Sequence, residues 1–185
     1  MKIIALQPGA KQYPQALHRC GDNWFQPIIH SIGNTALFQH PLTALFCSAK
    51  CPGDIILKAF DRVAELRDQG RAIISGFHTP VEKECLRILL RGKSPIVICP
   101  ARTLVKLRVP AEWKTALDAG RLLIASAFDS RKCRVITELA QQRNRFVAAL
   151  ANDILVLHAA PGGRLELFLT EIAGIGKPMC FLEKV

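Results

Sequence analysis

Long apolar runs and targeting signals are absent from this sequence of 185 residues. No stretch approaches the roughly 18 uninterrupted apolar residues of a membrane-spanning helix, and the N-terminal apolar run is too short for a secretory signal peptide. We therefore expect a cytoplasmic protein with no membrane partner.

Paired cysteines are missing as well. The seven cysteines are odd in number and form no Cys-x-x-Cys pair, which argues against a disulfide scaffold. Cys47 and Cys51 lie four residues apart without the second cysteine or histidine pair that a zinc site needs. Cys99 and Cys180 fall within apolar runs, which predicts that both are buried. We expect no metal and no cofactor.

Aromatic residues and acidic residues are both scarce. Lysine and arginine number 25 against 15 acidic residues, so the net charge is +10 and the pI is about 9.6. A basic surface attracts polyanions, chiefly nucleic acid. Only 6% of the residues are aromatic, which leaves few platforms on which bases could stack.

Six apolar runs recur at wide spacing and are continuous rather than alternating, which is typical of strands covered on both faces. Helical patterns lie between them, at 54–70, 79–92, much of 133–150 and about 165–173. This alternation predicts an α/β fold, a doubly wound and mostly parallel Rossmann-like sheet with helices on both faces. The six runs are 42–47, 72–74, 95–99, 122–125, 154–157 and 179–182.

The N-terminal segment differs from the rest of the chain. Residues 1–41 show no strong period, and we expect a small irregular or partly helical lead-in that packs on the edge of the sheet. Residues 42–185 would form the Rossmann-like domain.

Small residues, hydroxyls and cations follow the predicted strands. Ligands bind beyond the carboxyl ends of the strands in open α/β sheets, and such residues suit a phosphate cradle. Neither G-x-G-x-x-G nor G-x-x-x-x-G-K-[ST] occurs, which argues against an NAD site and a P-loop ATPase. The segments are CSAKCPGD (47–54), SGFHTP (75–80), CPAR (99–102), SAFDSRK (126–132) and HAAPGGR (158–164).

Each of these elements also has a purely structural interpretation. Ser75 and Gly76 could form only a tight turn between a strand and a helix. Thr79 and Glu82 have the spacing of a capping box, which is more often structural than catalytic. The arginines of QQRNR (141–145) could be a solvated helix face.

The order of motifs resembles the DNA-processing protein A (DprA/Smf) family. The chain has YPQAL, then SIGN, then a strand ending in CSAK, then SG after the next strand, then RNRFVAAL leading into DILVLHAA. The similarity runs from Tyr13 to the C-terminus, and RNRFVAALANDILVLHAA is its most specific piece. It implies a Rossmann fold that binds single-stranded DNA in DNA processing and recombination.

The chain departs from the family pattern at two turns. Lys50, in Cys47-Ser48-Ala49-Lys50, stands near the place of the arginine in the family's Gly-Ser-Arg. The turn His78-Thr79-Pro80-Val81-Glu82 replaces Ala-Arg-Gly-Ile-Asp and keeps only an acid. The LOG-type phosphoribohydrolases of the wider superfamily carry Pro-Gly-Gly-x-Gly-Thr-x-x-Glu, of which PGGRLELFLTE (161–171) matches only the first three residues.

Two functions therefore stay open. The favoured one is non-enzymatic, sequence-independent binding of single-stranded DNA. The alternative is a nucleotide-binding protein or a phosphoribohydrolase acting on nucleoside monophosphates, with Glu82, Glu166 and Arg143 as candidate groups. A homodimer also stays open. We expect one cleft to collect the nucleic-acid or phosphate-binding residues Ser48, Lys50, Ser75, Gly76, Arg143, Asn144, Arg145, Gly162 and Gly163.

Overall fold

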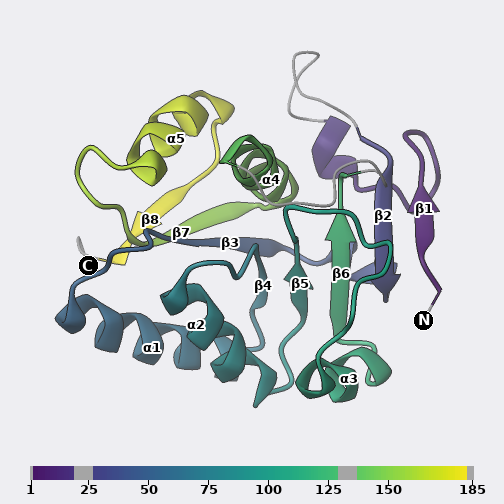
Figure 1. The fold of residues 1–185 in the computed structure, drawn as a ribbon, viewed down its shortest axis with the longest axis horizontal. Coiled ribbons are helices and arrows are strands. Elements are labelled where there is room, and N and C mark those ends of the chain that lie inside the picture. The colour runs from purple at the N-terminus through teal and green to yellow at the C-terminus, as the bar shows by residue number, and fades with distance from the viewer. Residues whose placement is uncertain (1, 19–26, 129–136, 183–185) are drawn as a thin grey trace.

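The computed structural model describes residues 2–18, 27–128 and 137–182. In these residues eight strands form one sheet, in the order β1-β2-β6-β5-β4-β3-β7-β8 (Figure 1). The strands are β1 (Ile4–Leu6), β2 (Ile29–Gly33), β3 (Leu42–Cys47), β4 (Ala72–Ser75), β5 (Ile96–Ile98), β6 (Leu122–Ser126), β7 (Asp153–His158) and β8 (Met179–Phe181).

The six strands from β3 to β8 are parallel to one another. They coincide with the six apolar runs of the sequence, to within a residue or two at each end. Apart from β8 at the edge, their residues are almost entirely buried, as continuous apolar patterning requires of strands covered on both faces. The predicted doubly wound, mostly parallel sheet is confirmed.

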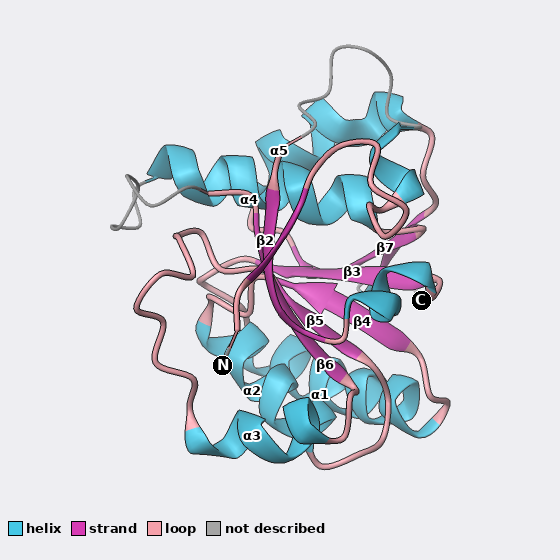
Figure 2. Ribbon diagram, turned by 90° about the vertical axis from the view of Figure 1, so that its right-hand side faces the viewer, coloured by secondary structure: helices cyan, strands magenta, loops and turns pink. Residues whose placement is uncertain are grey.

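Helices cover both faces of this sheet (Figures 1 and 2). On one face, side chains of α1, α2 and α3 share a core with Leu45, Ile73 and Ile96 of the strands. On the other face, α4 and α5 pack on Phe46 and Ile74. The helices are α1 (Gly53–Asp68), α2 (Pro80–Leu90), α3 (Ala111–Asp118), α4 (Thr137–Leu150) and α5 (Arg164–Ile172). The first three and last two helices therefore lie on opposite sides of the sheet.

The N-terminal segment is not the irregular lead-in that the sequence suggested. It contributes β1 and β2, which extend the sheet with antiparallel pairings, together with the short 3-10 helices η1 (Gln15–His18) and η2 (Thr35–Gln39). Leu6, Tyr13 and Leu17 are buried in the same core as α4 and α5. The short helices agree with the expected partly helical segment, whereas the strands β1 and β2 were not expected; the division of the chain at residue 41 stays a prediction.

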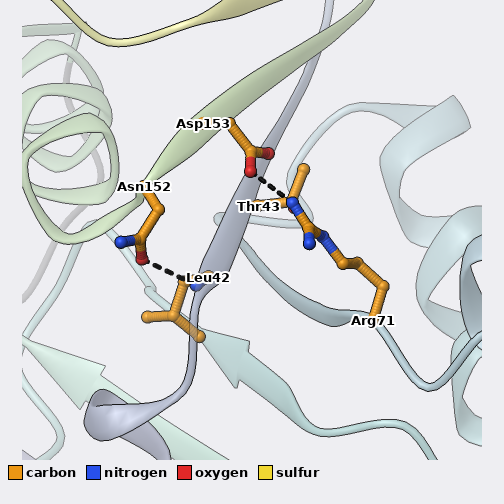
Figure 3. A network of polar contacts seen from close by, with 5 residues as sticks. All are labelled: Leu42, Thr43, Arg71, Asn152 and Asp153. Atoms are coloured by element: carbon orange, nitrogen blue, oxygen red, sulfur yellow. Dashed lines mark hydrogen bonds and ion pairs between the residues drawn. The ribbon is translucent and has the colours of Figure 1, made fainter.

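A polar network ties together three neighbouring strands, β4, β3 and β7, at their amino ends (Figure 3). Arg71, just before β4, donates from Nε to Thr43 Oγ1 on β3 at 2.8 Å, and its guanidinium forms an ion pair with Asp153 on β7. The Asn152 Oδ1 accepts from the Leu42 backbone N–H at 2.9 Å. These contacts hold β4, β3 and β7 together, so the opposite ends of the same strands are placed with respect to one another.

The cysteines of the apolar runs have different surroundings. Cys99 is completely buried after β5, as predicted, whereas Cys180 is exposed, so that prediction was wrong. The reason is position: β8 is an edge strand, and its middle side chain faces solvent. None of the described helices is long and apolar enough to cross a membrane.

Buried thiols make the fold sensitive to alkaline pH. Burial raises the pKa of Cys85 and of Cys99 from 9.0 to about 12. The unfolded chain therefore loses these protons first as pH rises, so their stabilising contribution is complete below pH 9 and is lost between about pH 9 and 12. We expect the free energy of unfolding to fall over that interval, by up to about 1.4 kcal/mol per pH unit for each thiol.

Urea denaturation at pH 8 to about 11 measures the slope of the free energy of unfolding against pH. A Cys85→Ala/Cys99→Ala variant should start less stable and lose stability more slowly with pH than the native chain. The same slope in both proteins would contradict the assignment. Burial also raises the pKa of Tyr13, from 10.0 to about 12, so this residue adds to the loss of stability above pH 10 in both proteins.

Candidate nucleic-acid interface

The sheet changes its winding direction beside β3. β3 is followed by α1, on one face of the sheet, and then by β4, its neighbour on one side. β7, the neighbour of β3 on the other side, is preceded by α4 on the opposite face. A cavity of about 320 Å³ lies at this switch point, between the carboxyl end of β3, the first turn of α2, helix α4 and the loop from β7 to α5. Ligands of open α/β folds bind at such a position.

Five of the nine predicted residues line the cavity, namely Ser48, Lys50, Arg143, Asn144 and Gly163. A shift in the β3–β7 pairing between Phe46 and Cys47 marks the point where β3 turns into the cavity. Ser48 links the two strands there, because its backbone N–H donates to His158 O at 2.9 Å and its Oγ accepts from Ala160 N at 3.0 Å.

Ser75 does not reach the cavity. Its side chain is fully buried, its Oγ donates to Leu45 O at 2.8 Å and it accepts from Phe77 N at 3.2 Å. These bonds stabilise a tight turn in which Phe77 has a φ of 46°. Ser75 is therefore part of the turn after β4 and is not available to a ligand.

Gly76 makes room for a buried arginine. A Cβ atom on Gly76 would lie 1.2 Å from an Nη atom of Arg143, so the Arg143 guanidinium packs directly on the glycine backbone. Burial lowers the pKa of Arg143, and the charge of nearby Glu82 opposes that shift. Gly76 itself does not line the cavity. Its lack of a side chain leaves room for Arg143, which does.

Arg145 points elsewhere. Two residues along an α-helix correspond to a rotation of about 200°, so Arg143 and Arg145 leave α4 on opposite sides. Arg145 forms two hydrogen bonds with Glu171 on α5, from Nε at 2.6 Å and from an Nη atom at 3.0 Å. Arg145 does not line the cavity, and this ion pair occupies its guanidinium.

The glycine turn before α5 is engaged by the protein itself. The Gly162 N–H donates to Glu166 Oε2 at 2.7 Å, and the Gly163 N–H donates to Ala160 O at 2.9 Å. A carboxylate thus already occupies the position in which an anion would bind at Gly162. Gly163 lines the cavity, but these two N–H groups do not form the free phosphate cradle that the sequence suggested.

Among the described residues, Glu82 is the one acidic residue that lines the cavity, and both oxygens of its carboxylate accept hydrogen bonds. Its Oε1 accepts from Cys47 N at 3.0 Å, and its Oε2 accepts from His78 N at 2.8 Å and Thr79 N at 3.2 Å. Its own N–H donates to Thr79 Oγ1, which completes the capping box of α2. Glu82 therefore joins the ends of β3 and β4 and is not free to act on a substrate.

Among the described residues, the charged groups that remain available in the cavity are cations. The Lys50 ammonium is exposed and makes no hydrogen bond or ion pair within the described ranges. Arg164, at the start of α5, lines the same cavity and makes a long hydrogen bond of 3.4 Å to Thr137 Oγ1. Arg164 was not singled out from the sequence, although its position directly after Pro161-Gly162-Gly163 was a usable signal.

The family model described as DNA recombination-mediator protein A matches residues 5–165. The chain belongs to this family. The resemblance inferred from the motifs is therefore confirmed. A search of the curated proteins found no match.

Solved structures share the fold at low sequence identity. DNA processing protein A from Streptococcus pneumoniae is 17% identical, with a TM-score of 0.79 over 98% of this chain and 63% of that one. The protein of the same name from Helicobacter pylori is 17% identical, with a TM-score of 0.75 over 98% of this chain and 80% of that one. The molybdenum cofactor carrier protein of Chlamydomonas reinhardtii is 12% identical, with a TM-score of 0.52 and 76% of each chain covered. This chain thus spans less than two thirds of the streptococcal protein.

Proposed function

We propose that this protein binds single-stranded DNA without sequence preference, in DNA processing and recombination. The observation that carries the proposal is the switch-point cavity, where, within the described part of the chain, Lys50 and Arg164 meet no free carboxylate because Glu82 is occupied. Family membership supports it, and so does the relative from Helicobacter pylori, which has a single-stranded DNA binding mode.

Such a site suits a phosphate backbone. Phosphate oxygens are acceptors only, and every strand carries them regardless of its bases, so a set of donors and cations binds DNA independently of its sequence. The low aromatic content fits this mode, since base stacking is not needed for it. A cytoplasmic location, a nucleotide ligand and a homodimer stay predictions.

The phosphoribohydrolase alternative finds less support in the same geometry. Cleavage of an N-glycosidic bond needs a carboxylate near the ribose. Glu82 has its oxygens on three backbone N–H groups, and Glu166 holds the Gly162 N–H on the exposed side of the turn. Neither carboxylate is free for that reaction.

A salt-dependent titration tests the proposal. We expect oligonucleotides of unrelated sequence to bind with similar affinity, and log Kd to rise with log salt by about 0.7 for each phosphate contact on a single strand. Fluorescence anisotropy between about 50 and 200 mM salt measures this slope. Salt-insensitive binding, or binding of nucleoside monophosphates with no binding of DNA, would contradict the function.

A further inference from the structure

We infer that the switch-point cavity holds a terminal phosphomonoester, so that the protein engages the phosphorylated end of a DNA strand. The inference rests on the proposed function and specifies which part of the strand enters the cavity. It is carried by three features of the cavity: the orientation of one amide, the charge of the lining, and the size of the space.

The amide of Asn144 is fixed by the buried arginine beside it. Arg143 Nε donates to Asn144 Oδ1 at 2.8 Å, and an arginine has no acceptor, so the amide oxygen must face Arg143. The Nδ2 group is then left as a donor for a ligand. Ser48 is similar, because its Oγ already accepts from Ala160 N and keeps its hydrogen to donate. Both side chains therefore select an acceptor.

The charge of the cavity matches a dianion better than a monoanion. Among the described residues, the lining has three cations, Lys50, Arg143 and Arg164, against one carboxylate, Glu82, so its net charge is positive. A phosphomonoester carries about −1.5 to −2 at neutral pH and offers three terminal oxygens. An internal phosphodiester carries a single charge and has two such oxygens.

The cavity is of a size to take a single nucleotide. Its apolar residues include the buried Phe46 and Phe168, which pack edge to face with ring centres 5.4 Å apart. The turn after β3, the first turn of α2, helix α4 and the loop before α5 all contribute to its lining. Its volume, about 320 Å³, is at the lower limit of small-ligand pockets and suits one nucleotide.

Matched DNAs test the inference with the full chain. Linear oligothymidylates carrying a 5′-phosphate, a 3′-phosphate or no terminal phosphate are compared with a circular strand of equal length by competition anisotropy. We expect one phosphorylated end to bind about tenfold more tightly than the unphosphorylated strand, and the circle to bind no better than the latter. If the four DNAs bind equally, recognition of the end is overturned while the proposed function stands; if none binds, the proposed function itself fails. Displacement of the phosphorylated strand by thymidine monophosphate at equal concentration would also overturn recognition of a strand end.

An isosteric variant tests the contribution of the Asn144 amide in the cavity. Asn144→Asp keeps an acceptor for Arg143 but replaces the Nδ2 donor with an oxygen that repels phosphate. The matched control is Gln142→Glu, which adds the same charge to an exposed position of α4 that does not line the cavity. We expect Asn144→Asp to abolish the preference for phosphorylated ends and Gln142→Glu to retain it, with both variants folded by circular dichroism. Retention of the preference in folded Asn144→Asp would overturn the inference.

Discussion

Replacing Lys50 and Arg164 together with alanine is expected to weaken binding to single-stranded DNA by about 10- to 100-fold at low salt. Each cation makes a charge-assisted contact to phosphate, and every 1.4 kcal/mol lost corresponds to about tenfold in Kd. The salt slope should flatten by about 1.4, since two contacts of about 0.7 each are removed. Both side chains are exposed and leave the core intact. Anisotropy titrations at several salt concentrations measure affinity and slope together.

The matched control removes the same charge at the other edge of the sheet. Arg91 and Lys93 are exposed and precede β5, so they lie at the amino ends of the parallel strands. An Arg91→Ala/Lys93→Ala variant should bind DNA almost as well as the native chain. Equal losses in the two double variants would show that overall charge, and not the cavity, determines binding.

The parallel part of the sheet could be predicted because burial on both faces leaves a local signature. Runs such as LTALFC and ILVL are apolar at all positions or all but one, which is the continuous pattern of strands covered on both faces. β1 and β2 carry no such signature, since they are short, antiparallel and at the edge, where Ile4 is partly exposed. The helix α3 was missed for a related reason: it has eight residues and only Ala116 and Leu117 are buried.

The candidate site could be predicted in outline but not in detail. Strand ends follow from the strands, so Ser48 and Lys50 could be placed near the loop that contains Gly163. The partners of individual side chains depend on contacts far apart in the sequence. Arg145 pairs with Glu171, 26 residues away, and Ser75 bonds to Leu45 on the neighbouring strand, 30 residues away. No local pattern indicates such partners.

Glu82 presents the sharpest test of the structural assignment. Replacing it with alanine should destabilise the fold by about 2–4 kcal/mol, because the buried Cys47 N–H loses its acceptor, at about 1–3 kcal/mol, and the part-buried His78 and Thr79 N–H groups lose theirs at a smaller cost. Glu82→Gln keeps the shape, yet its NH₂ group must face at least one of those N–H donors. It should therefore also destabilise, by less than alanine does. Urea denaturation measures both changes.

The control for this effect is Glu112, an exposed acid in the first turn of α3. Its replacement with alanine removes only a favourable helix-end charge and should cost less than about 1 kcal/mol. A Glu82→Gln protein as stable as the native chain would show that the carboxylate is free, which would restore Glu82 as a candidate acid in a nucleotide-cleaving reaction. Loss of stability in Glu82→Gln but not in Glu112→Ala would establish that this carboxylate holds the strand ends from which the cavity is built.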